Sequence, residues 1–550
     1  MHRVIKQIIE SRGIGENERE EFFSPRPQLA YNPFLLANMR EGVDLLLDAV
    51  DEGRNIVIYG DYDVDGITST SLMMKVIGSL TDKVSYYIPS RFDEGYGLHN
   101  ESIDRIHENG GEFILTVDCG SVSKEETEYA HSLGIQTLVT DHHNMSSISA
   151  EGLIINPMQE EDEYPFKGLA GVGVAYKLAL AISRIRPIPK EIMAEALEFA
   201  AVGTIADIMV MKDENRTIVK CGLRFMKLGC HNIGLRNLIK LSGLDYSKLK
   251  TSDISFCIAP RLNAAGRLGD ASLGVKLFLS ETESEAIGYC NMLIEANHKR
   301  RSLQDEAFSK SLEIANNNKE DDFLLLEVND AHEGVLGIVA GKLRENVNRP
   351  VVIITKSGDY YKGTGRSIST VNLFDMLDKY RDSFISFGGH SAACGFSILP
   401  EKVDELRTNL NQDIEELYKE KNNLFDIEYH YDAELEISDV SLELANDIQM
   451  LEPCGKGNEI PEFKLSGVIP VNWKFLKGEK KHAKFTIASK HCESLECLIF
   501  QEAEKYEEIA TSNTPVDIIG VIEVNHWRDS VKPQLRVRCI LPEGGLCNDR

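Results

Sequence analysis

Three aspartates, Asp61, Asp63 and Asp65, follow an apolar run at alternate positions and stand between two glycines. Carboxylates this close repel one another, so three ionised together imply a bound hard cation or nearby cationic side chains. An isolated D-x-D is more often a solvated acidic turn after a strand. An EF-hand loop begins in the same way, but its twelfth position, which should be a bidentate glutamate, is Leu72. The remaining interpretation is a strand-to-helix turn, at the end of a strand where open α/β sheets bind ligands.

Two further strand ends carry side chains of the same kind. Asp118 follows one apolar run directly, and Asp141, His142 and His143 follow the next. One aspartate after a strand is ordinary, because it can cap a helix. A parallel sheet, however, brings neighbouring strand ends into one crevice, so this pattern favours a metal site. Because neighbours in an extended segment point in opposite directions, we expect the two histidines not to share an ion.

Asp207 stands alone among apolar residues in the segment 203–209. A lone buried aspartate is usually a hydrogen-bonded structural residue, but it can also be a ligand that reaches a site from a second element. Sequence spacing leaves both interpretations open.

Basic side chains in glycine-rich stretches are the candidates for binding an anion. Residues 261–267 contain two arginines in a predicted glycine-punctuated turn, which is either a surface loop or a phosphate clamp. Arg366 and His390 lie in the stretches 363–367 and 387–395. Glycines there allow close approach to a ligand or simply form tight turns, and the two side chains favour an anionic ligand.

Alternating strands and helices position these residues. The predicted strands, with helix-length segments such as 66–80 between them, are 56–59, 84–88, 113–117, 136–139 and 153–155. This alternation predicts an α/β fold with a parallel, doubly wound sheet, whose strand order stays open. Helices are predicted over 169–184 and 190–201.

The pattern of predicted secondary structure changes twice in the second half of the chain. A long charged helix over 281–316 has little apolar surface and is expected to bridge two lobes. A second α/β domain follows, with strands at 323–328 and 351–355 around a helix at 337–345. After a charged helix near 401–422, short strands with polar turns predict a small β-barrel or sandwich.

Composition bounds the class of protein. The 550 residues suffice for three or four domains, and 42% hydrophobic residues indicate a globular chain. No stretch approaches the roughly 18 apolar residues of a membrane span, and no signal peptide is visible, so a cytoplasmic location is expected. The 11 scattered cysteines, without a C-x-x-C pair, indicate reduced thiols.

The net charge of −27 argues only weakly against a nucleic-acid partner, because basic residues can be confined to one groove. Between residues 464 and 484 lie six lysines and a single acid, Glu479, with Trp473 and Phe475 among them. Basic residues interleaved with aromatics suit single-stranded nucleic acid. A solvated lysine-rich hairpin accounts for the stretch equally well.

The motifs together resemble a known superfamily. In order, the four motifs of the DHH phosphoesterases are matched by GDYDVDG (60–66), VDC (117–119), DHH (141–143) and GTIAD (203–207). The signatures of the associated DHHA1 domain are matched by GTGRS (363–367) and GGHSAACG (388–395). Similarity to the RecJ family of single-strand-specific 5′→3′ DNA exonucleases lies in RLNAAGR (261–267), HEGVLGIVA (332–340) and LEPCGKGN (451–458).

The resemblance spans roughly residues 30–545 and implies a domain order. The implied units are an N-terminal extension (1–45), a DHH catalytic domain (46–215), a helical connector with the long linking helix (216–320), a DHHA1 domain (321–425) and an OB-like barrel (426–550).

The resemblance also implies a site with two Mn²⁺ or Mg²⁺ ions. One ion would be held by Asp63 and Asp118 with Asp61 nearby, and the other by Asp65, Asp118, His142 and Asp207. His143 would lie against the scissile phosphate and complete the catalytic set. Phosphate and DNA would be bound by Arg91, Arg267, Arg366, Ser367, His390, Trp473, Lys477 and Lys481.

The implied activity is degradation of single-stranded DNA from the 5′ end to nucleoside 5′-monophosphates, in DNA repair and recombination. The resemblance alone implies a single-strand-binding protein and a helicase as partners, and a monomer is expected. One alternative is a DHH phosphodiesterase of short oligonucleotides or cyclic dinucleotides, against which the lysine-rich stretch argues. Another is an inactive DNA-binding relative, against which the complete ligand set argues.

The chain departs from the family pattern at three positions. Tyr59 stands where related DHH enzymes carry a metal-binding histidine, so Asp61 is expected to replace that ligand. Cys394 stands where alanine is usual, and Cys454 where phenylalanine is common.

Overall fold

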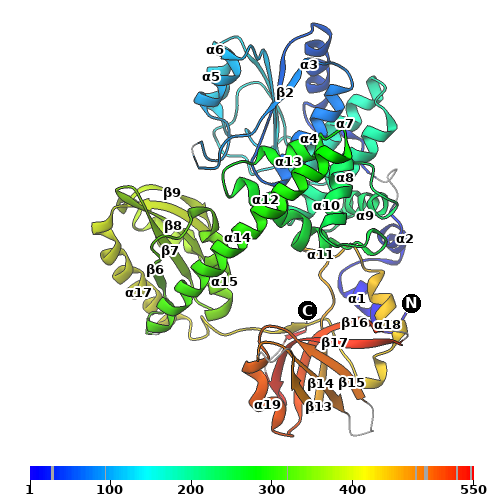
Figure 1. The fold of residues 1–550 in the computed structure, drawn as a ribbon, viewed down its shortest axis with the longest axis vertical. Helices are drawn as coiled ribbons and strands as arrows, with labels where there is room; N and C mark the ends of the chain where they lie inside the picture. The colour runs from blue at the N-terminus through cyan, green and yellow to red at the C-terminus, as the bar shows by residue number, and fades with distance from the viewer. Residues whose placement is uncertain are drawn as a thin grey trace.

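The computed structural model describes residues 1–25, 30–92, 94–318, 320–476, 480–488, 494–527, 530–545 and 548–549. Three bodies are visible in Figure 1: a first lobe containing a parallel sheet, a second lobe reached through a long helix, and a C-terminal barrel. Among the described residues, no helix combines the length and apolar character that a membrane span requires.

A five-stranded sheet is the centre of the first lobe. Its order is β2-β1-β3-β4-β5, with every pairing parallel. The strands are β1 (Ile56–Gly60), β2 (Val84–Tyr87), β3 (Phe113–Val117), β4 (Gln136–Thr140) and β5 (Leu153–Ile155). This confirms the predicted parallel α/β class. The order also places the ends of β1, β3 and β4 side by side.

Helices cover both faces of this sheet. Ile56 and Ile58 point into a core shared with α3 (Met39–Asp51), α4 (Val64–Gly78), α7 (Gly171–Ile185) and α8 (Lys190–Ala206). Val57 and Tyr59 point the other way, towards α5 (Asn100–Glu108) and α6 (Lys124–Ser132). Both faces of β1 and β3 are therefore buried, which explains why these strands are continuous apolar runs.

Further helices extend the first lobe towards the barrel. They are α9 (Asp213–Lys227), α10 (Ile233–Leu241), α11 (Thr251–Asp253), a π-helical turn (Ile254–Ile258), α12 (Ala259–Gly266) and α13 (Ser272–Phe278). The prediction of a turn over 261–267 is wrong, because α12 is helical almost to its end. Its buried face, with Leu262 and Ala265, packs into the lobe's core, and Pro260 is tolerated in its first turn.

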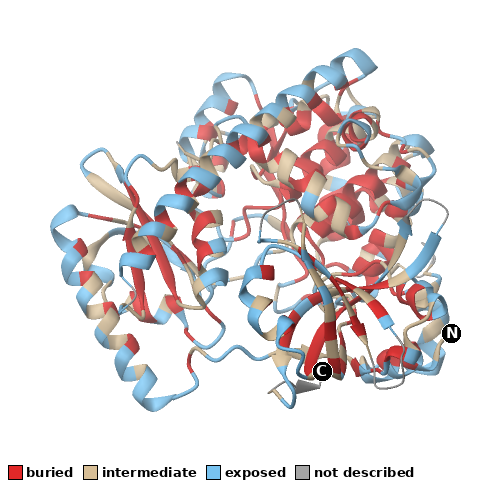
Figure 2. Cartoon of the chain, turned by 60° about the horizontal axis from the view of Figure 1, so that its bottom comes forward, coloured by how far each residue is buried: buried red, intermediate tan, exposed pale blue. Residues whose placement is uncertain are grey.

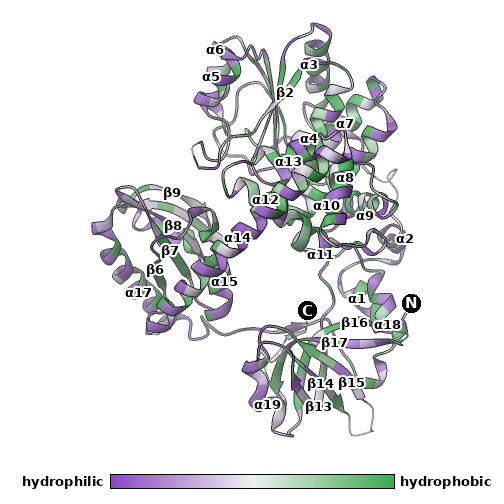
Figure 3. Ribbon diagram, viewed as in Figure 1, coloured by the Kyte–Doolittle hydropathy of each residue, from purple (hydrophilic) through white to green (hydrophobic). Residues whose placement is uncertain are grey.

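The long helix α14 (Glu283–Asn317) joins the two lobes, as predicted. Figure 3 shows hydrophilic residues along its exposed middle. The second lobe has a sheet of order β6-β7-β8-β10-β9, in which only β6 and β7 are parallel. Its elements are β6 (Leu324–Glu327), α15 (Glu333–Val347), β7 (Val351–Ser357), β8 (Tyr360–Arg366), α16 (Leu373–Asp378), β9 (Phe384–His390), β10 (Ala393–Ile398) and α17 (Val403–Glu420).

The C-terminal strands form an OB-like barrel. The first long strand, β13, pairs with β14 on one side and β16 on the other, so the sheet returns on itself, while β15 and β17 run parallel. The elements are α18 (Leu442–Gln449), β13 (Phe463–Phe475), β14 (Ala483–Ala488), β15 (Ser494–Ile499), α19 (Glu507–Thr511), β16 (Val516–Trp527) and β17 (Ser530–Pro542). Short pairings add β11 (His430–Tyr431) with β18 (Asn548–Asp549), and β12 (Ala433–Glu434) with β13.

The first residues of the chain belong to this barrel's core. Helix α1 (Arg3–Ser11) buries Val4, Ile5, Ile8 and Ile9 among the barrel and α18 side chains. Figure 1 shows α1 beside α18, and Figure 2 shows buried residues concentrated inside each of the three bodies. A short α2 (Arg19–Phe23) then leads back to the first lobe. The segment predicted as an N-terminal extension is thus divided between two bodies.

Candidate metal centre

The acidic side chains gather where strands of the first sheet end. Asp61 follows β1, Asp118 follows β3 and Asp141 follows β4. Asp63 caps α4, accepting hydrogen bonds from the backbone N–H groups of its first turn, and Asp207 ends α8. The chain therefore brings its acids together from five separate elements.

Two groups of potential ligand atoms meet at Asp118. Oxygens of Asp61, Asp63 and Asp118 lie within 4.8 Å of one another, as do ligand atoms of Asp65, His142 and Asp207. The Nε2 atom of His142 is 3.1 Å from Oδ1 of Asp118. It is 3.8 Å from the nearest oxygens of both Asp65 and Asp207. All six predicted metal-binding residues lie in these two groups.

The start of α7 fixes the Asp65 carboxylate. The N–H groups of Gly171 and Val172 each donate to one of its oxygens at 2.8 Å, where the helix N-terminus favours negative charge. Gly171 is also required sterically, because a Cβ there would lie 2.4 Å from Oδ1 of Asp118. Any larger residue at position 171 would push Asp118 out of place.

The carboxyl groups repel one another strongly. Burial and the charge of Asp63 raise the pKa of Asp61 to about 8 and that of Asp207 to about 6. Burial, followed by the neighbouring acids, raises the pKa values of Asp65 and Asp118 well above the ordinary range. Burial and the charge of His143 lower the pKa of His142 to about 4, which keeps its imidazole neutral.

These residues fit divalent cations. Among the described residues, the buried Oδ1 atom of Asp61 has no hydrogen-bond partner, and that of Asp118 lies 3.1 Å from Nε2 of His142 without a well-formed hydrogen bond. A neutral imidazole such as that of His142 is a metal ligand. A donor set of carboxylate oxygens with one imidazole suits Mn²⁺ or Mg²⁺ better than Zn²⁺. A bound cation would also reverse the mutual repulsion of the acids.

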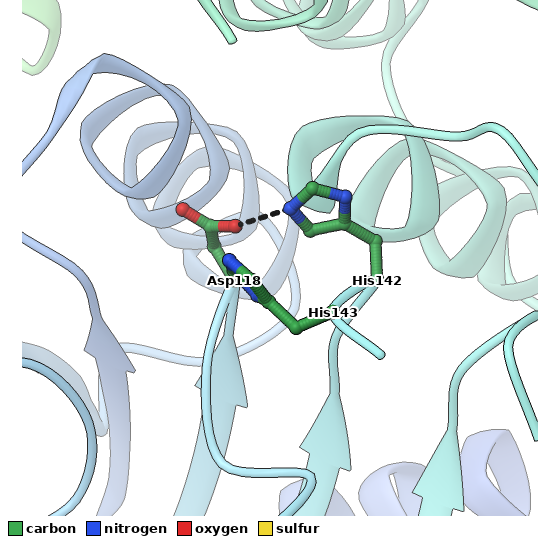
Figure 4. Close-up of side chains that lie close together, drawn as sticks. All are labelled: Asp118, His142 and His143. Atoms are coloured by element: carbon green, nitrogen blue, oxygen red, sulfur yellow. Dashed lines mark ion pairs between the residues drawn. The ribbon is translucent and has the colours of Figure 1, made fainter. Parts of the chain in front are cut away.

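The two histidines do not point in opposite directions, so that prediction is wrong. Their ring centroids are 4.4 Å apart, and both rings lie beside Asp118 in Figure 4. Alternation requires an extended strand, but β4 ends at Thr140 and residues 141–149 have no strand structure. Ligand atoms of Asp118 and both histidines come within 4.8 Å of one another.

Asp141 and Tyr96 orient His143, and neither was predicted as a site residue. Nδ1 of His143 is 2.8 Å from Oδ1 of Asp141 and 2.9 Å from the Tyr96 hydroxyl. Burial lowers the pKa of His143, but the hydrogen bond and charge of Asp141 outweigh it and raise the pKa to about 8. Tyr96 stands between two glycines with positive φ, a pattern that signals a tight loop presenting one side chain.

The predicted arginines meet at the junction of the two lobes. Arg91 lies 5.1 Å over the ring of Tyr62, which stands between two of the acids. Arg267, at the end of α12, donates to the carbonyl of Gly334 in the second lobe at 3.1 Å. Burial and the charges of Arg91, Arg300 and Arg366 lower the pKa of Arg267 to about 10. We call Arg91, Arg267 and Arg366 the arginine pocket.

The second lobe adds two polar side chains beside Arg366. The Ser367 hydroxyl is buried and has no hydrogen-bond partner among the residues that the structure describes. His390 ends the edge strand β9 and is exposed, and both it and Arg366 are paired with Ala393 of β10. Two strands thus present them at one end of the sheet.

The predicted DNA-binding residues of the barrel lie apart from this centre. Trp473 is half-buried and packs its ring 4.8 Å from that of Phe485. Lys481 is exposed, and Lys477 lies outside the described residues. Three other lysines of the run form ion pairs, Lys464 with Asp517, Lys480 with Glu507 and Lys484 with Glu496.

Family models match three parts of the chain. The DHH family N-terminal domain matches residues 55–204, the DHHA1 domain 320–416 and the RecJ OB domain 431–539. The single-stranded-DNA-specific exonuclease RecJ of Bacillus subtilis (strain 168) is 33% identical over 540 residues, covering 97% of this chain and 67% of that protein.

Solved structures agree with these matches. Crystal structures of RecJ from Thermus thermophilus in complex with Mn²⁺ and with Mg²⁺ superpose with TM-scores of 0.83 and 0.79 at 28% and 27% identity. Each covers 99% of this chain and 76% of the solved chain. The chain therefore belongs to the RecJ family of exonucleases.

Proposed function

We propose that the protein is a metal-dependent exonuclease that degrades single-stranded DNA from its 5′ end and releases nucleoside 5′-monophosphates. The observation that carries this proposal is the position of the arginine pocket directly beside the acidic centre, with Arg91 over Tyr62 between Asp61 and Asp63. A phosphate-binding pocket next to a metal centre suits cleavage close to a strand end. The relatives named above support the same substrate and metals.

The acids and His142 would hold two ions. Asp61, Asp63 and Asp118 would bind one, and Asp65, Asp118, His142 and Asp207 the other. Two bound Mn²⁺ or Mg²⁺ ions supply Lewis acidity that activates water and stabilises charge on the attacking and leaving oxygens. The chain contributes the fixed positions of the ligands, of which Asp65 is held by α7 and Asp63 by α4.

His143 holds a proton beside the reacting phosphate. Its pKa of about 8 keeps much of the imidazole protonated near neutral pH, with Nδ1–H directed to Asp141. The positive ring can then donate to a phosphate oxygen and balance the charge that develops there. Asp141 and Tyr96 act as positioning residues for this ring.

The arginine pocket would bind the 5′-terminal phosphate. Arginine's planar fork matches phosphate oxygens, and Arg91, Arg267 and Arg366 converge there from both lobes. The hydroxyl of Ser367 and the imidazole of His390 would complete the phosphate contacts. A terminal phosphate held in this pocket sets the distance to the metal centre, so cleavage proceeds one nucleotide at a time from the 5′ end.

Digestion of 5′- and 3′-labelled single strands and of the matching duplex, with Mn²⁺ or Mg²⁺, tests the proposal. We expect label release as mononucleotide at once from the 5′ end and late from the 3′ end, and little digestion of blunt duplex. Asp118→Asn should abolish hydrolysis, and the exposed Asp104→Asn serves as the charge-matched control. Early release from the 3′ end, or faster hydrolysis of a dinucleotide than of long strands, would contradict the assignment.

We extend the proposal to DNA repair and recombination in the cytoplasm, with the enzyme acting as a monomer. A helicase would supply single strands by separating a duplex and a single-strand-binding protein would keep them apart, so we propose both as partners on the strength of the family resemblance. Faster digestion of a tailed duplex when a helicase is added would support this role, and an unchanged rate would contradict it.

A further inference from the structure

A loop of the barrel domain is clamped against the first lobe. The loop covers residues 451–458, and the guanidinium of Arg216, on α9, donates to the carbonyls of Leu451, Glu452 and Pro453 at 2.8–3.2 Å. Arg216 is 4% exposed, and Phe22 lies 3.7 Å beneath its guanidinium. A buried arginine that uses its donors on a neighbouring backbone fixes both the position and the direction of that backbone.

Hydrogen bonds within the loop, and from other segments, also fix its conformation. The side-chain amide of Asn458 donates to the carbonyls of Leu451 and Pro453 at 3.0 and 2.8 Å, and its oxygen accepts from Arg12. Thr251, at the start of α11, donates to Glu452 at 3.2 Å. The clamped loop is therefore a fixed structure held by the first lobe and by the N-terminal segment.

This loop runs along the chain that leaves the metal centre. The N–H of Met211 donates to the carbonyl of Lys456 at 2.7 Å, only four residues after Asp207. Both glycines that flank Lys456 are packed there: a Cβ at Gly455 would lie 3.3 Å from Met211, and one at Gly457 would lie 3.3 Å from Lys212. Lys456 is thus tied through its backbone to the segment that carries a predicted metal ligand.

The charge of Lys456 is available to a ligand. Its side chain is exposed, and no described carboxylate lies within ion-pair distance of its Nζ. Its positive charge reaches Asp207, whose pKa it lowers against the larger effects of burial and Asp63. The barrel lysines 464, 480 and 484, by contrast, are all neutralised by acids.

We propose that Lys456 binds a backbone phosphate of the DNA strand beside the metal centre, so that the barrel domain contributes a residue to the active-site entrance. The proposal rests on the proposed function and deepens it. The two ions act on the scissile phosphate, so the next phosphates along the strand need cations of the protein, and an exposed lysine close to Asp207 supplies one. The hydrogen bonds from Arg216 to the loop explain how Lys456, more than 200 positions after Asp207 in sequence, is held at a fixed position relative to it.

Salt dependence of binding gives a direct test. We would measure equilibrium binding of a fluorescent oligothymidylate over a series of NaCl concentrations for the parent protein, Lys456→Ala and Lys456→Arg. Lys6→Ala is the matched control, because Lys6 is exposed on α1 and carries the same charge. Loss of one phosphate contact to a single strand should reduce the slope of log K against log salt by about 0.7 in Lys456→Ala only. Lys456→Arg should retain the parent slope.

Steady-state kinetics distinguishes the role of Lys456 from the proposed exonuclease function. With long oligothymidylate and Mn²⁺, Lys456→Ala should raise KM several-fold at unchanged kcat, whereas hydrolysis of a 5′-phosphorylated dinucleotide should be unaffected. An unchanged slope and KM, or an equal loss on the dinucleotide, would overturn the role of Lys456. Failure of the parent protein to digest single strands would instead overturn the proposed function. Thermal unfolding should be the same in all variants, because both lysines are exposed.

Discussion

Replacing Asp61 by asparagine should stabilise the metal-free protein and weaken its response to metal. Asp61 is 4% exposed, and its Oδ1 atom has no hydrogen-bond partner in the described part of the chain. It is also the predicted substitute for a histidine ligand that the chain lacks at Tyr59. Without metal, its carboxylate is repelled by Asp63 and deprived of water. Asparagine has nearly the same shape and no charge, so it removes the repulsion and leaves the packing intact.

The pKa of Asp61 gives the size of this effect. It is raised from 3.8 to about 8 by burial and by Asp63. The difference is about four pH units, and each unit corresponds to about 1.4 kcal/mol, so the ionised carboxylate costs up to about 6 kcal/mol in the folded state. Below pH 3.8 the group is protonated in both states and costs nothing. As the pH rises towards 8, only the unfolded chain gains by ionisation, so the free energy of unfolding falls.

The advantage of Asp61→Asn should therefore be greatest at or above about pH 8 and vanish as the pH falls towards 4. Differential scanning calorimetry in EDTA measures it, and a first-lobe transition should rise by roughly 2–4 °C for each kcal/mol. Mn²⁺ should then raise the transition of the parent protein more than that of the variant. Asp104→Asn, at an exposed site, is the control.

Two results would refute this reasoning. An advantage that grew at low pH would mean that Asp61 is not the group with the raised pKa. Full stabilisation of Asp61→Asn by Mn²⁺ would mean that Asp61 contributes nothing to the metal centre. In the second case the ligand set would reduce to the other five residues.

Three further predictions concern separate parts of the molecule. Asp141→Asn removes the main cause that raises the pKa of His143 to about 8. In a pH–rate profile, the loss of activity at alkaline pH should therefore begin at a lower pH in the variant. An alkaline limb at the same pH in both proteins would contradict the role of protonated His143. Deletion of residues 431–550 should cause aggregation, because it uncovers the apolar face of α1. Deletion of residues 1–23 as well should restore solubility, as judged by gel filtration. A soluble protein after the first deletion alone would contradict this packing. Phe256 is 74% exposed on the π-helical turn, a few residues after Thr251, which contacts the clamped loop. If a DNA base stacks on its ring, Phe256→Ala should weaken binding of long single strands by about 1–3 kcal/mol in anisotropy titrations without changing thermal unfolding. Unaltered affinity would contradict a stacking role.

The grouping of the acids was predictable because it follows from sheet topology. Once the strands were taken as parallel, the residues after β1, β3 and β4 had to share one edge. Their side chains meet as expected, and so does Asp207, whose own segment left its role open. The local patterns were strong because a short, continuous apolar run bounded by turn residues is typical of a strand buried on both faces.

The features that sequence reasoning missed depend on contacts that local patterns do not contain. A turn was predicted over residues 261–267 because of their glycine and two arginines, yet the buried face of α12 makes all but the last of them helical. The end of β4 was predicted to within one residue, but the residues after it were taken as extended, whereas the N–H groups of His142 and His143 both donate to the Asp141 carboxylate and form a turn. That α1 completes the barrel involves residues more than 400 positions apart.

The two kinds of binding residue are distributed differently over the three bodies. All predicted metal ligands come from the first lobe, and Lys456 is tied to that lobe through Arg216 and Met211. The arginine pocket, by contrast, is divided, with Arg91 and Arg267 in the first lobe and Arg366 in the second. A change in the angle between the lobes would therefore open the pocket for the terminal phosphate while the metal centre and the strand contact kept their geometry. Such a change would lengthen or break the hydrogen bond from Arg267 to the carbonyl of Gly334, which joins the two lobes directly.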